Sequence, residues 1–455
     1  MIHLTRICSK FVVSGGKSVK KGNMKALLPI AVFLVIYLGL GLLFEYGLHI
    51  EMGFYNIPII IAFLAAILVA CLQNRKLSFD DKLTVMGEGV GDKNIITMLL
   101  IFLTAGAFVG VVGRSSAQSV AYFLLDIIPA NYAVAVLFVV ACFVSTAMGT
   151  SVGTITLLTP IAVEVSQAAG FSGPRCVASV MGGAMFGDNR SFISDTTIAA
   201  CNGQGCAMQD KFKGNFLIAL PAAVCSVVLI LLCCGTSGNG SQIGGSYDLI
   251  LIIPYVLVLI GGIVGINVFV VLLAGIASGA VIMLLTGQIE AISLLSAMGA
   301  GASGMFETCM VAILVSAMCA LIRVYGGFDA LLAFIRSAFH GRRGGQLGMG
   351  LLVGAMDIAT ANNTVAIVMA NPIAKEMSTD YGITSKRAAC ILDTFSCIFQ
   401  GVIPYGAQML VAISACTEMG LTVSAFQIMQ YLFYPSLLLA SSLEAIFLVK
   451  EKTRK

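Results

Sequence analysis

Tryptophan is absent from this 455-residue sequence, histidine occurs three times, and only 11% of the residues are charged. By contrast, 58% of the residues are hydrophobic. A chain of this composition has too little polar surface to fold as an ordinary water-soluble globule. We therefore expect a membrane protein, in which tyrosine, lysine and arginine take the interfacial positions that tryptophan often holds.

Several motifs of membrane enzymes and pumps are also missing. The histidines lie at positions 3, 49 and 340, so no His-Glu-x-x-His motif or other zinc site of ordinary spacing can form. Met185–Asp188 lacks the first glycine of the Gly-x-Gly-Asp motif of intramembrane proteases. Gly16–Ser18 resembles the end of a phosphate-binding loop, but Phe11 replaces the first glycine of that loop. These absences argue against an enzyme, an ATP-driven pump and a bound cofactor.

Uncharged stretches long enough to cross the roughly 30 Å hydrocarbon core of a bilayer as helices recur along the chain. They lack the alternation of polar and apolar residues that membrane strands require, so we predict an all-α polytopic membrane protein. By length alone, the sequence predicts about ten to thirteen membrane segments, some of them incomplete. The clearest stretches are Ala26–Phe44, Gly53–Leu72, Ile95–Gly113, Gly214–Tyr247 and Leu249–Ile289.

Lysine and arginine are concentrated in a few loops, and this bias predicts the orientation of the chain. Short cytoplasmic loops of membrane proteins carry an excess of these residues. Both termini should therefore be cytoplasmic, with Ala26–Phe44 as a retained first helix and not a cleaved signal peptide. We attribute the net charge of +4 to this topology and expect no nucleic-acid partner. The basic segments are residues 1–25, 75–93, 209–213, 323–343 and 450–455, whereas residues 45–56 and 235–247 contain no lysine or arginine.

Two parts of the chain resemble each other when the sequence is laid over itself, without gaps, so that Pro160 falls on Pro372. Residues 160–175 and 372–387 then share seven of sixteen positions. Because the loop charges give the two halves opposite orientations, we predict inverted repeats with discontinuous or re-entrant helices and a binding site at the bilayer midplane. The same alignment pairs Thr150 with Asn362, Ser151 with Asn363, and Asp188 with Gln400.

This repeat divides the chain into six predicted parts. The two halves that would form the transport machinery are separated by a linking region. In order, the parts are a basic cytoplasmic segment (1–25), N-terminal transmembrane helices (26–94), the first transport repeat (95–234), a linking loop with transmembrane helices (235–307), the second, inverted repeat (308–449) and a cytoplasmic tail (450–455).

Polar side chains at membrane depth must be paired, hydrated or protonated, so they are the candidates for function. Gly149–Thr154 interrupts an apolar run with glycines and hydroxyls, which favours an unwound segment whose oxygens bind a small cation. A packing face of small residues is the alternative. In the second half, Ala361–Thr364 is the counterpart of Gly149–Thr154. Its asparagine side chains carry carbonyl oxygens, which are hard ligands that suit Na⁺. We assign Thr150, Ser151, Asn362 and Asn363 to cation binding, and Thr154 and Thr364 to substrate binding.

The segment Gly187–Thr197 gives the strongest local signal. It places two carboxylates and four hydroxyls in eleven residues between apolar helices. The alternative is an aqueous loop in which Asp195 caps the next helix, although the segment has no lysine and does not otherwise resemble a loop. We predict that it binds cations or protons through Asp188, Ser191, Ser194, Asp195, Thr196 and Thr197.

The matching region of the second half has Asp393, Ser396 and Gln400 at helical spacing, which gives one polar helix face. Ile403–Gln408 follows as a predicted helix break. Asp357 is a further candidate, with a structural ion pair as its alternative role. We assign Asp357, Asp393 and Gln400 to the cation and proton site, and Ser396, Tyr405 and Gln408 to substrate binding.

Three of these motifs resemble those of the NhaC-type sodium/proton antiporter family: Gly149–Thr154, Gly187–Thr197 and Ile403–Gly406. Together with helix number and length, the resemblance covers nearly the whole chain. It implies exchange of Na⁺ for H⁺, which some relatives couple to malate, lactate or amino acids. The sequence departs from the family pattern at Phe192–Ile193, where proline and its neighbour are usual, and at Val152, where tryptophan is common. These departures leave the carboxylates intact and affect the identity of the substrate.

We therefore predict a secondary transporter of the plasma membrane that exchanges Na⁺ for H⁺ by alternating access. Na⁺ and H⁺ stabilise the same buried negative oxygens, at Asp195 and Asp188, so competition between them yields exchange. The partners are the lipid bilayer and small ions, and a homodimer is left open. A Na⁺- or H⁺-coupled carrier of an amino acid or organic anion, and a passive channel, are the alternatives.

Overall fold

The computed structural model describes residues 22–49, 56–191, 194–234, 246–264 and 266–448. These residues form helices and turns without a strand, which confirms the predicted all-α class. In chain order the elements are η1 (Met24–Leu27), α2 (Leu28–Leu34), η2 (Val35–Gly39), α3 (Leu40–Leu42), η3 (Leu43–Gly47), α4 (Ile59–Gln73), α5 (Phe79–Val90), α6 (Lys93–Ile127), α7 (Ala130–Met148), α8 (Ser151–Ala169), α9 (Gly173–Arg190), α10 (Asp195–Gln204), α11 (Met208–Cys234), α12 (Leu249–Val264), α13 (Val268–Leu285), α14 (Ala291–Gly304), α15 (Phe306–Val324), α16 (Gly327–Ala338), α17 (Gly341–Thr360), α18 (Asn363–Asp380), α19 (Ser385–Val402), α20 (Ala407–Glu418), α21 (Ala425–Met429) and α22 (Phe433–Phe447).

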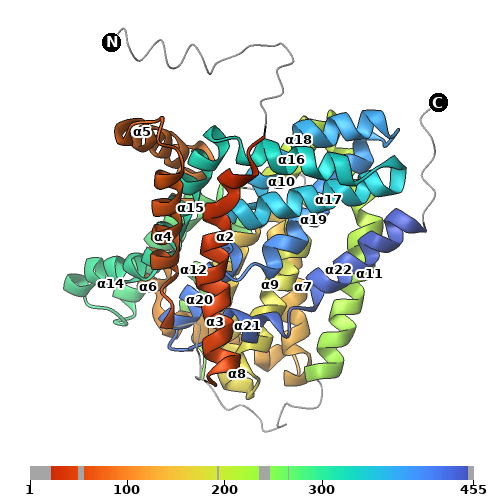
Figure 1. Ribbon diagram of the computed structural model, residues 1–455. Coiled ribbons are helices and arrows are strands. Elements are labelled where there is room, and N and C mark those ends of the chain that lie inside the picture. Colours follow the sequence, from red (N-terminus) through yellow and green to blue (C-terminus); the bar gives the residue numbers. More distant parts are fainter. Residues whose placement is uncertain (1–21, 50–55, 192–193, 235–245, 265, 449–455) are drawn as a thin grey trace.

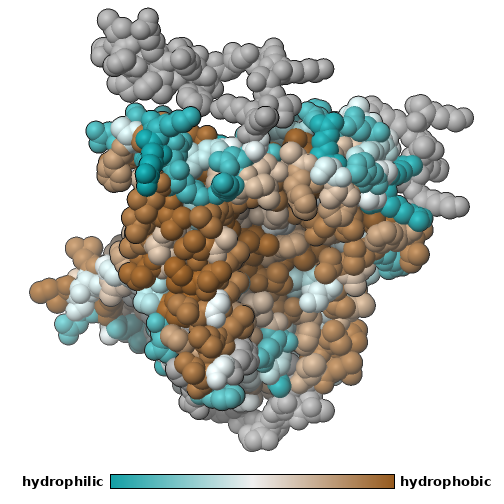
Figure 2. Space-filling model, in the orientation of Figure 1, coloured by the Kyte–Doolittle hydropathy of each residue, from teal (hydrophilic) through white to brown (hydrophobic). Residues whose placement is uncertain are grey.

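The surface of the molecule fits a bilayer. Among the described residues, seven helices are long and apolar enough to cross a membrane, and five shorter apolar helices accompany them. Figure 2 shows a broad hydrophobic band, bounded by hydrophilic residues at the end where α5, α16 and α18 lie. Large apolar side chains such as Leu68 and Leu217 are exposed, as expected for residues that contact lipid. The chain is therefore a multi-pass membrane protein, as predicted.

Two helical hairpins, α7–α8 and α17–α18, turn at equivalent residues. The residue at each turn has a left-handed backbone: Gly149 with φ 70° and Ala361 with φ 49°. The next residue, Thr150 or Asn362, is extended, and its side chain accepts a hydrogen bond from a backbone N–H three residues later. This capping satisfies an N–H group that the start of a helix leaves free. The same local conformation thus recurs at the two positions that the sequence alignment of the halves places opposite each other.

A second pair of helix breaks obeys the same alignment. α9 ends at Arg190 and α10 begins at Asp195, while α19 ends at Val402 and α20 begins at Ala407. Arg190 is separated from Val402, and Asp195 from Ala407, by the same number of residues that separates Gly149 from Ala361. α9 packs against α7 and α8, and α19 packs against α17 and α18, so each half joins one hairpin to one broken helix.

The two hairpins occupy opposite ends of the molecule. In Figure 1, α18 lies at the end that carries α5 and α16, whereas α8 lies at the other end. This arrangement is the one expected of inverted repeats. The two-fold relation itself and the six domain boundaries stay predictions.

Several sequence-based expectations fall wholly or partly outside the described residues. These are most of the basic N-terminal segment, the departures Phe192 and Ile193, most of the linking loop, and the C-terminal tail. The first predicted helix, Ala26–Phe44, is described as the continuous run of short helical elements from η1 to η3.

The hairpin turns generate a matched test of local backbone strain. Gly149→Ala places a side chain on a left-handed residue, so we expect it to lower the stability by about 1–2 kcal/mol. Ala361→Gly relieves the same strain and should change the stability by less than about 1 kcal/mol, because glycine loses more chain entropy on folding. Thermal unfolding of the purified variants in detergent measures both. Equal losses in the two variants would show that the left-handed backbone is not what determines stability at these tips.

Candidate functional site

The four helix breaks surround a cavity of about 80 Å³. Its walls come from both hairpin tips, from the breaks after α9 and α19, and from α6. The structure therefore brings together segments that are far apart in the sequence and that come from both halves. The predicted site residues that line the cavity are Thr150, Ser151, Asp188, Ser194, Asp195, Thr196, Asn362, Asn363, Thr364, Gln400 and Gln408.

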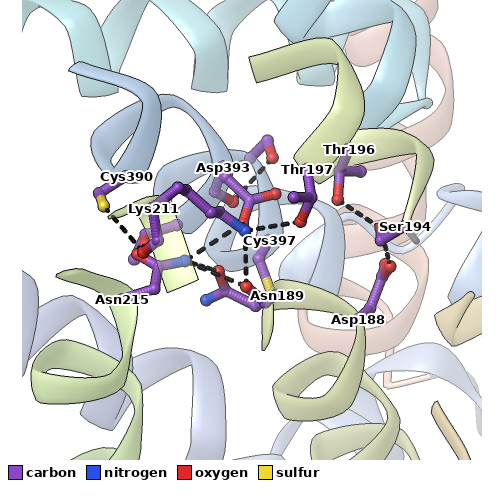
Figure 3. A network of polar contacts seen from close by, with 12 residues as sticks. Asp188, Asn189, Ser194, Thr196, Thr197, Lys211, Asn215, Cys390, Asp393 and Cys397 are labelled. Atoms are coloured by element: carbon purple, nitrogen blue, oxygen red, sulfur yellow. Dashed lines mark hydrogen bonds and ion pairs between the residues drawn. The ribbon is translucent and has the colours of Figure 1, made fainter. Parts of the chain in front are cut away.

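Asp188 lies at the centre of a chain of hydrogen bonds beside this cavity. Its side chain is 6% exposed. Ser151 Oγ donates to Asp188 Oδ2 at 2.8 Å, and Ser194 Oγ donates to Asp188 Oδ1 at 2.5 Å. Gln408 Nε2 donates to Ser151 Oγ at 2.8 Å, and the Ser194 and Thr196 hydroxyls share a hydrogen bond of 2.8 Å. Figure 3 shows the part of this chain that joins Asp188 to Thr196. The hydroxyls of Ser151 and Ser194 hold the carboxyl group of Asp188 in place at the cavity wall.

Two amide oxygens in the cavity wall lack hydrogen-bond partners among the described residues. Gln400 Nε2 donates to the carbonyl of Ala361 at 3.2 Å, but Gln400 Oε1 accepts no hydrogen bond from the described part of the chain. The same holds for Gln408 Oε1, which is buried and has no partner within the described residues. A buried oxygen without a donor is costly unless a cation or water binds it. No group of three His, Cys, Asp or Glu side chains with metal-binding geometry occurs in the described part of the chain. One carboxylate with amide and hydroxyl oxygens suits a weakly bound monovalent cation better than a tight divalent site.

Asp195 takes a different position from Asp188. It lies in the first turn of α10, where the helix dipole favours a negative charge. Its side chain is exposed at the cavity rim, and the charge of Lys93 at the start of α6 attracts it. The N-cap is Ser194, whose side chain bonds Asp188 and does not cap the helix. The sequence did not distinguish Asp188 from Asp195 as the cation site, whereas in the structure Asp188 is the buried one of the two.

Seven predicted site residues do not line the cavity. Thr154 and Ser396 each donate to a carbonyl of their own helix, as hydroxyls in helices commonly do. Tyr405 donates to the carbonyl of Ile358 at 2.7 Å. Ser191 is the C-cap residue of α9 and is buried. The remaining three are Thr197 and Asp393, which belong to the network below, and Asp357, which is fully buried.

A buried ion pair between Lys211 and Asp393 lies next to the cavity (Figure 3). Both side chains are 1% exposed. Lys211 Nζ also donates to Thr197 Oγ1 at 2.7 Å and to the carbonyl of Asn189 at 2.8 Å. Asn215 Nδ2 donates to Asp393 Oδ2 at 3.2 Å. The network therefore ties α9, α10 and α11 of the first half to α19 of the second.

Lys211 was not among the predicted site residues. Residues 209–213 look like a charged cytoplasmic loop in the sequence, whereas the structure places them in the first turns of α11 with Lys211 inside the protein. One signal was available: Lys211 and Asn215 are four residues apart at the start of a long apolar run, so they share a helix face. The distant partner, Asp393, could not be identified from that spacing.

A match to a protein-family model and a similar bacterial protein both indicate a transporter. A family model described as the Na⁺/H⁺ antiporter family matches residues 18–236 and 246–450. The malate-2H⁺/Na⁺-lactate antiporter of Bacillus subtilis (strain 168) is 23% identical over 211 residues, which cover 46% of this chain and 44% of that protein. The match thus spans less than half of this relative. The crystal structure of the YdaH transporter from Alcanivorax borkumensis aligns with a TM-score of 0.42 and 14% identity, over 93% of this chain and 97% of that one.

The Lys211–Asp393 pair generates a prediction about stability. Lys211→Met leaves Asp393 buried without its cation, so we expect a loss of about 3–5 kcal/mol. Lys211→Met combined with Asp393→Asn removes both charges and should recover most of that loss. Unfolding in detergent, followed for wild type, both single variants and the double variant, gives the coupling energy. Additive losses in the double variant would contradict a direct pair.

Proposed function

The chain belongs to the Na⁺/H⁺ antiporter family, and from this premise we propose that it exchanges Na⁺ for H⁺ by alternating access. The observation that carries the proposal is Asp188. It is a buried carboxylate held by two hydroxyls at a cavity whose wall also contains the side-chain oxygens of Gln400 and Gln408, which have no hydrogen-bond partner among the described residues. Na⁺ accepts carboxylate, hydroxyl and amide oxygens as ligands in one site.

Exchange at this site follows from competition. A cation at the carboxylate and a proton on it neutralise the same charge, so the binding of one weakens the binding of the other. Asp188 serves as the shared group in this scheme, while the exposed Asp195 raises the local concentration of cations at the rim. Movement of one half against the other then opens the site to either side of the membrane.

The charges on the described surface support an orientation for the proposal. The helices α16, α17 and α19 contain basic residues that include Arg336, Arg342 and Lys386. Of these helices, α16 lies at the end that also carries α5 (Figure 1). By the excess of positive charge on the inner side, this end faces the cytoplasm, and the chain resides in the plasma membrane with both termini inside.

Proton flux in proteoliposomes tests the role of Asp188. After a Na⁺ pulse, an enclosed pH-sensitive dye should report proton movement in wild type. Asp188→Asn should lower this flux by on the order of a hundredfold, because the shared negative charge is lost. Asp195→Asn should raise the half-saturating Na⁺ concentration less than about fivefold, because an exposed charge contributes about 1 kcal/mol or less. Asp329→Asn, at an exposed carboxylate of α16, is the control.

The relative size of the two losses shows which aspartate forms the cation site. If Asp195→Asn abolishes the flux and Asp188→Asn spares it, the cation site lies at the rim and the assignment of Asp188 is wrong. A wild type without Na⁺-evoked proton flux would contradict simple exchange.

A second candidate is a cation-coupled carrier of a small organic anion. The name of the Bacillus subtilis relative, a malate-2H⁺/Na⁺-lactate antiporter, favours this candidate. In addition, the N-termini of α8 and α18, capped by Thr150 and Asn362, lie at the cavity, where their positive dipole ends attract an anion. Against it, about 80 Å³ holds an ion with a few waters more readily than a dicarboxylate.

Addition of an organic anion separates the two candidates. For plain Na⁺/H⁺ exchange, lactate or malate on either side of the liposome should change radiolabelled Na⁺ uptake by less than about twofold, the change expected without a binding site for the anion. Acetate is the control for leakage of weak acids. Na⁺ uptake that requires lactate or malate, and that saturates with its concentration, would favour the carrier.

A further inference from the structure

Asp357 is buried without any of the partners that the other buried aspartates have. It lies near the end of α17, one turn before the tip of the second hairpin, and is 0% exposed. Among the described residues, neither carboxyl oxygen has a hydrogen-bond partner. Asp188 has two hydroxyls and Asp393 has Lys211, whereas the described ion pairs do not include Asp357.

The groups that face Asp357 are uncharged. The titratable neighbours close enough to sense its charge are the phenol of Tyr405, between α19 and α20, and the thiol of Cys397 in α19. The backbone of Gln400 lies beside it, and across the described residues no charged side chain acts on it. Tyr405 packs edge-on against Phe33 at 4.7 Å between ring centroids, and Phe33 stacks on Phe63. This aromatic group closes the region on the side of α2 and α4.

An ionised carboxylate is strongly disfavoured in such surroundings, because only the backbone of Gln400 lies close enough to replace any of the water that it loses. Asp357 therefore holds a proton in this conformation. Glu418 also has two oxygens without partners, but it is only partly buried and lies at the far end of α20. Asp357 is distinguished by complete burial and by its place on a hairpin that lines the cation cavity.

Two further cavities lie beside the tip of the hairpin that carries Asp357. One of about 200 Å³ lies between α5, α15 and the second hairpin, with exposed Glu88 and Arg323 and with Thr360 in its wall. A smaller one of about 20 Å³ is lined by Thr360, Ala361 and Asn362 and adjoins the cation cavity at Asn362. Water-sized spaces thus flank the hairpin tip from Thr360 to Asn362, about one turn beyond Asp357. A small movement of the hairpin would bring water to the carboxyl group and let it ionise.

We propose that Asp357 is a second proton-carrying site, separate from the cation site at Asp188. The carboxylic acid releases its proton to water on one side of the membrane and takes up another from the opposite side during the return step. This inference rests on the proposed Na⁺/H⁺ exchange and adds a proton to each cycle.

The ratio of proton flux to Na⁺ flux tests this site. In one set of proteoliposomes, an enclosed pH dye and radiolabelled Na⁺ measure both fluxes. Asp357→Asn, a neutral side chain of the same shape, should lower the ratio of protons to Na⁺ by about half, because one of two carriers is lost. Exchange of radiolabelled Na⁺ for Na⁺ should persist in this variant and be lost in Asp188→Asn. Asp329→Asn is the matched control and should keep the wild-type ratio.

Two transport results would overturn the proposal. An unchanged ratio in Asp357→Asn would mean that its proton does not move. Loss of Na⁺/Na⁺ exchange in a variant with wild-type thermal unfolding would place Asp357 in the cation site.

Infrared spectroscopy gives a readout that does not depend on transport. The carbonyl band of a protonated carboxylic acid should be present in wild type at neutral pH, reduced in Asp357→Asn and unchanged in Asp329→Asn. An identical band in wild type and Asp357→Asn would overturn the proposal. If wild type shows no Na⁺-evoked proton flux, exchange itself fails, and the infrared difference still decides whether Asp357 holds a proton.

Discussion

The free-energy cost of placing a charge away from water governs the interior of this protein. Each buried aspartate avoids that cost in its own way. Asp393 is paired with Lys211, Asp188 accepts hydrogen bonds from Ser151 and Ser194, and Asp357 has neither kind of partner. A paired carboxylate is stabilised by its cation, one that accepts hydroxyl hydrogen bonds regains part of the stabilisation that water gave it, and one without partners is the most costly to ionise. The three carboxyl groups therefore differ in how readily they ionise, as the roles proposed for Asp188 and Asp357 require.

The backbone faces the same constraint as the side chains. A helix that stops inside the membrane leaves N–H and C=O groups free, and these must be satisfied by protein or water. The structure places four such breaks around one cavity, so the protein on each side of the cavity surrounds them. Thr150 and Asn362 each cap one of the interrupted helices with their own side chain. Collecting the breaks in one place both limits their cost and provides oxygens for an ion.

The internal repeat is the reason that the sequence alone could locate the hairpin tips and helix breaks. The alignment of the two halves located both hairpin tips, and the same offset relates the breaks after α9 and α19. Local sequence did not reveal that Asp188 points into the protein while Asp195 lies at the rim, because that depends on the bend between α9 and α10. Nor did it reveal that Lys211 is buried, since its charged neighbours resemble a loop and its partner is distant in the chain. Thr154 and Ser396 are polar at membrane depth, yet their hydroxyls bond their own helices.

The contacts between the halves connect these residues to the proposed movement. Gln408 of the second half donates to Ser151 of the first, which in turn holds Asp188. A cation that binds both Asp188 and the free oxygens of Gln400 or Gln408 must bridge the two halves, because its ligands belong to different ones. Its binding energy then depends on how the halves are placed, and any displacement that separates those oxygens weakens binding. A ligand shifts a conformational equilibrium only through its different affinities for the two states, so a site divided between two halves provides a direct way to couple ion binding to their movement.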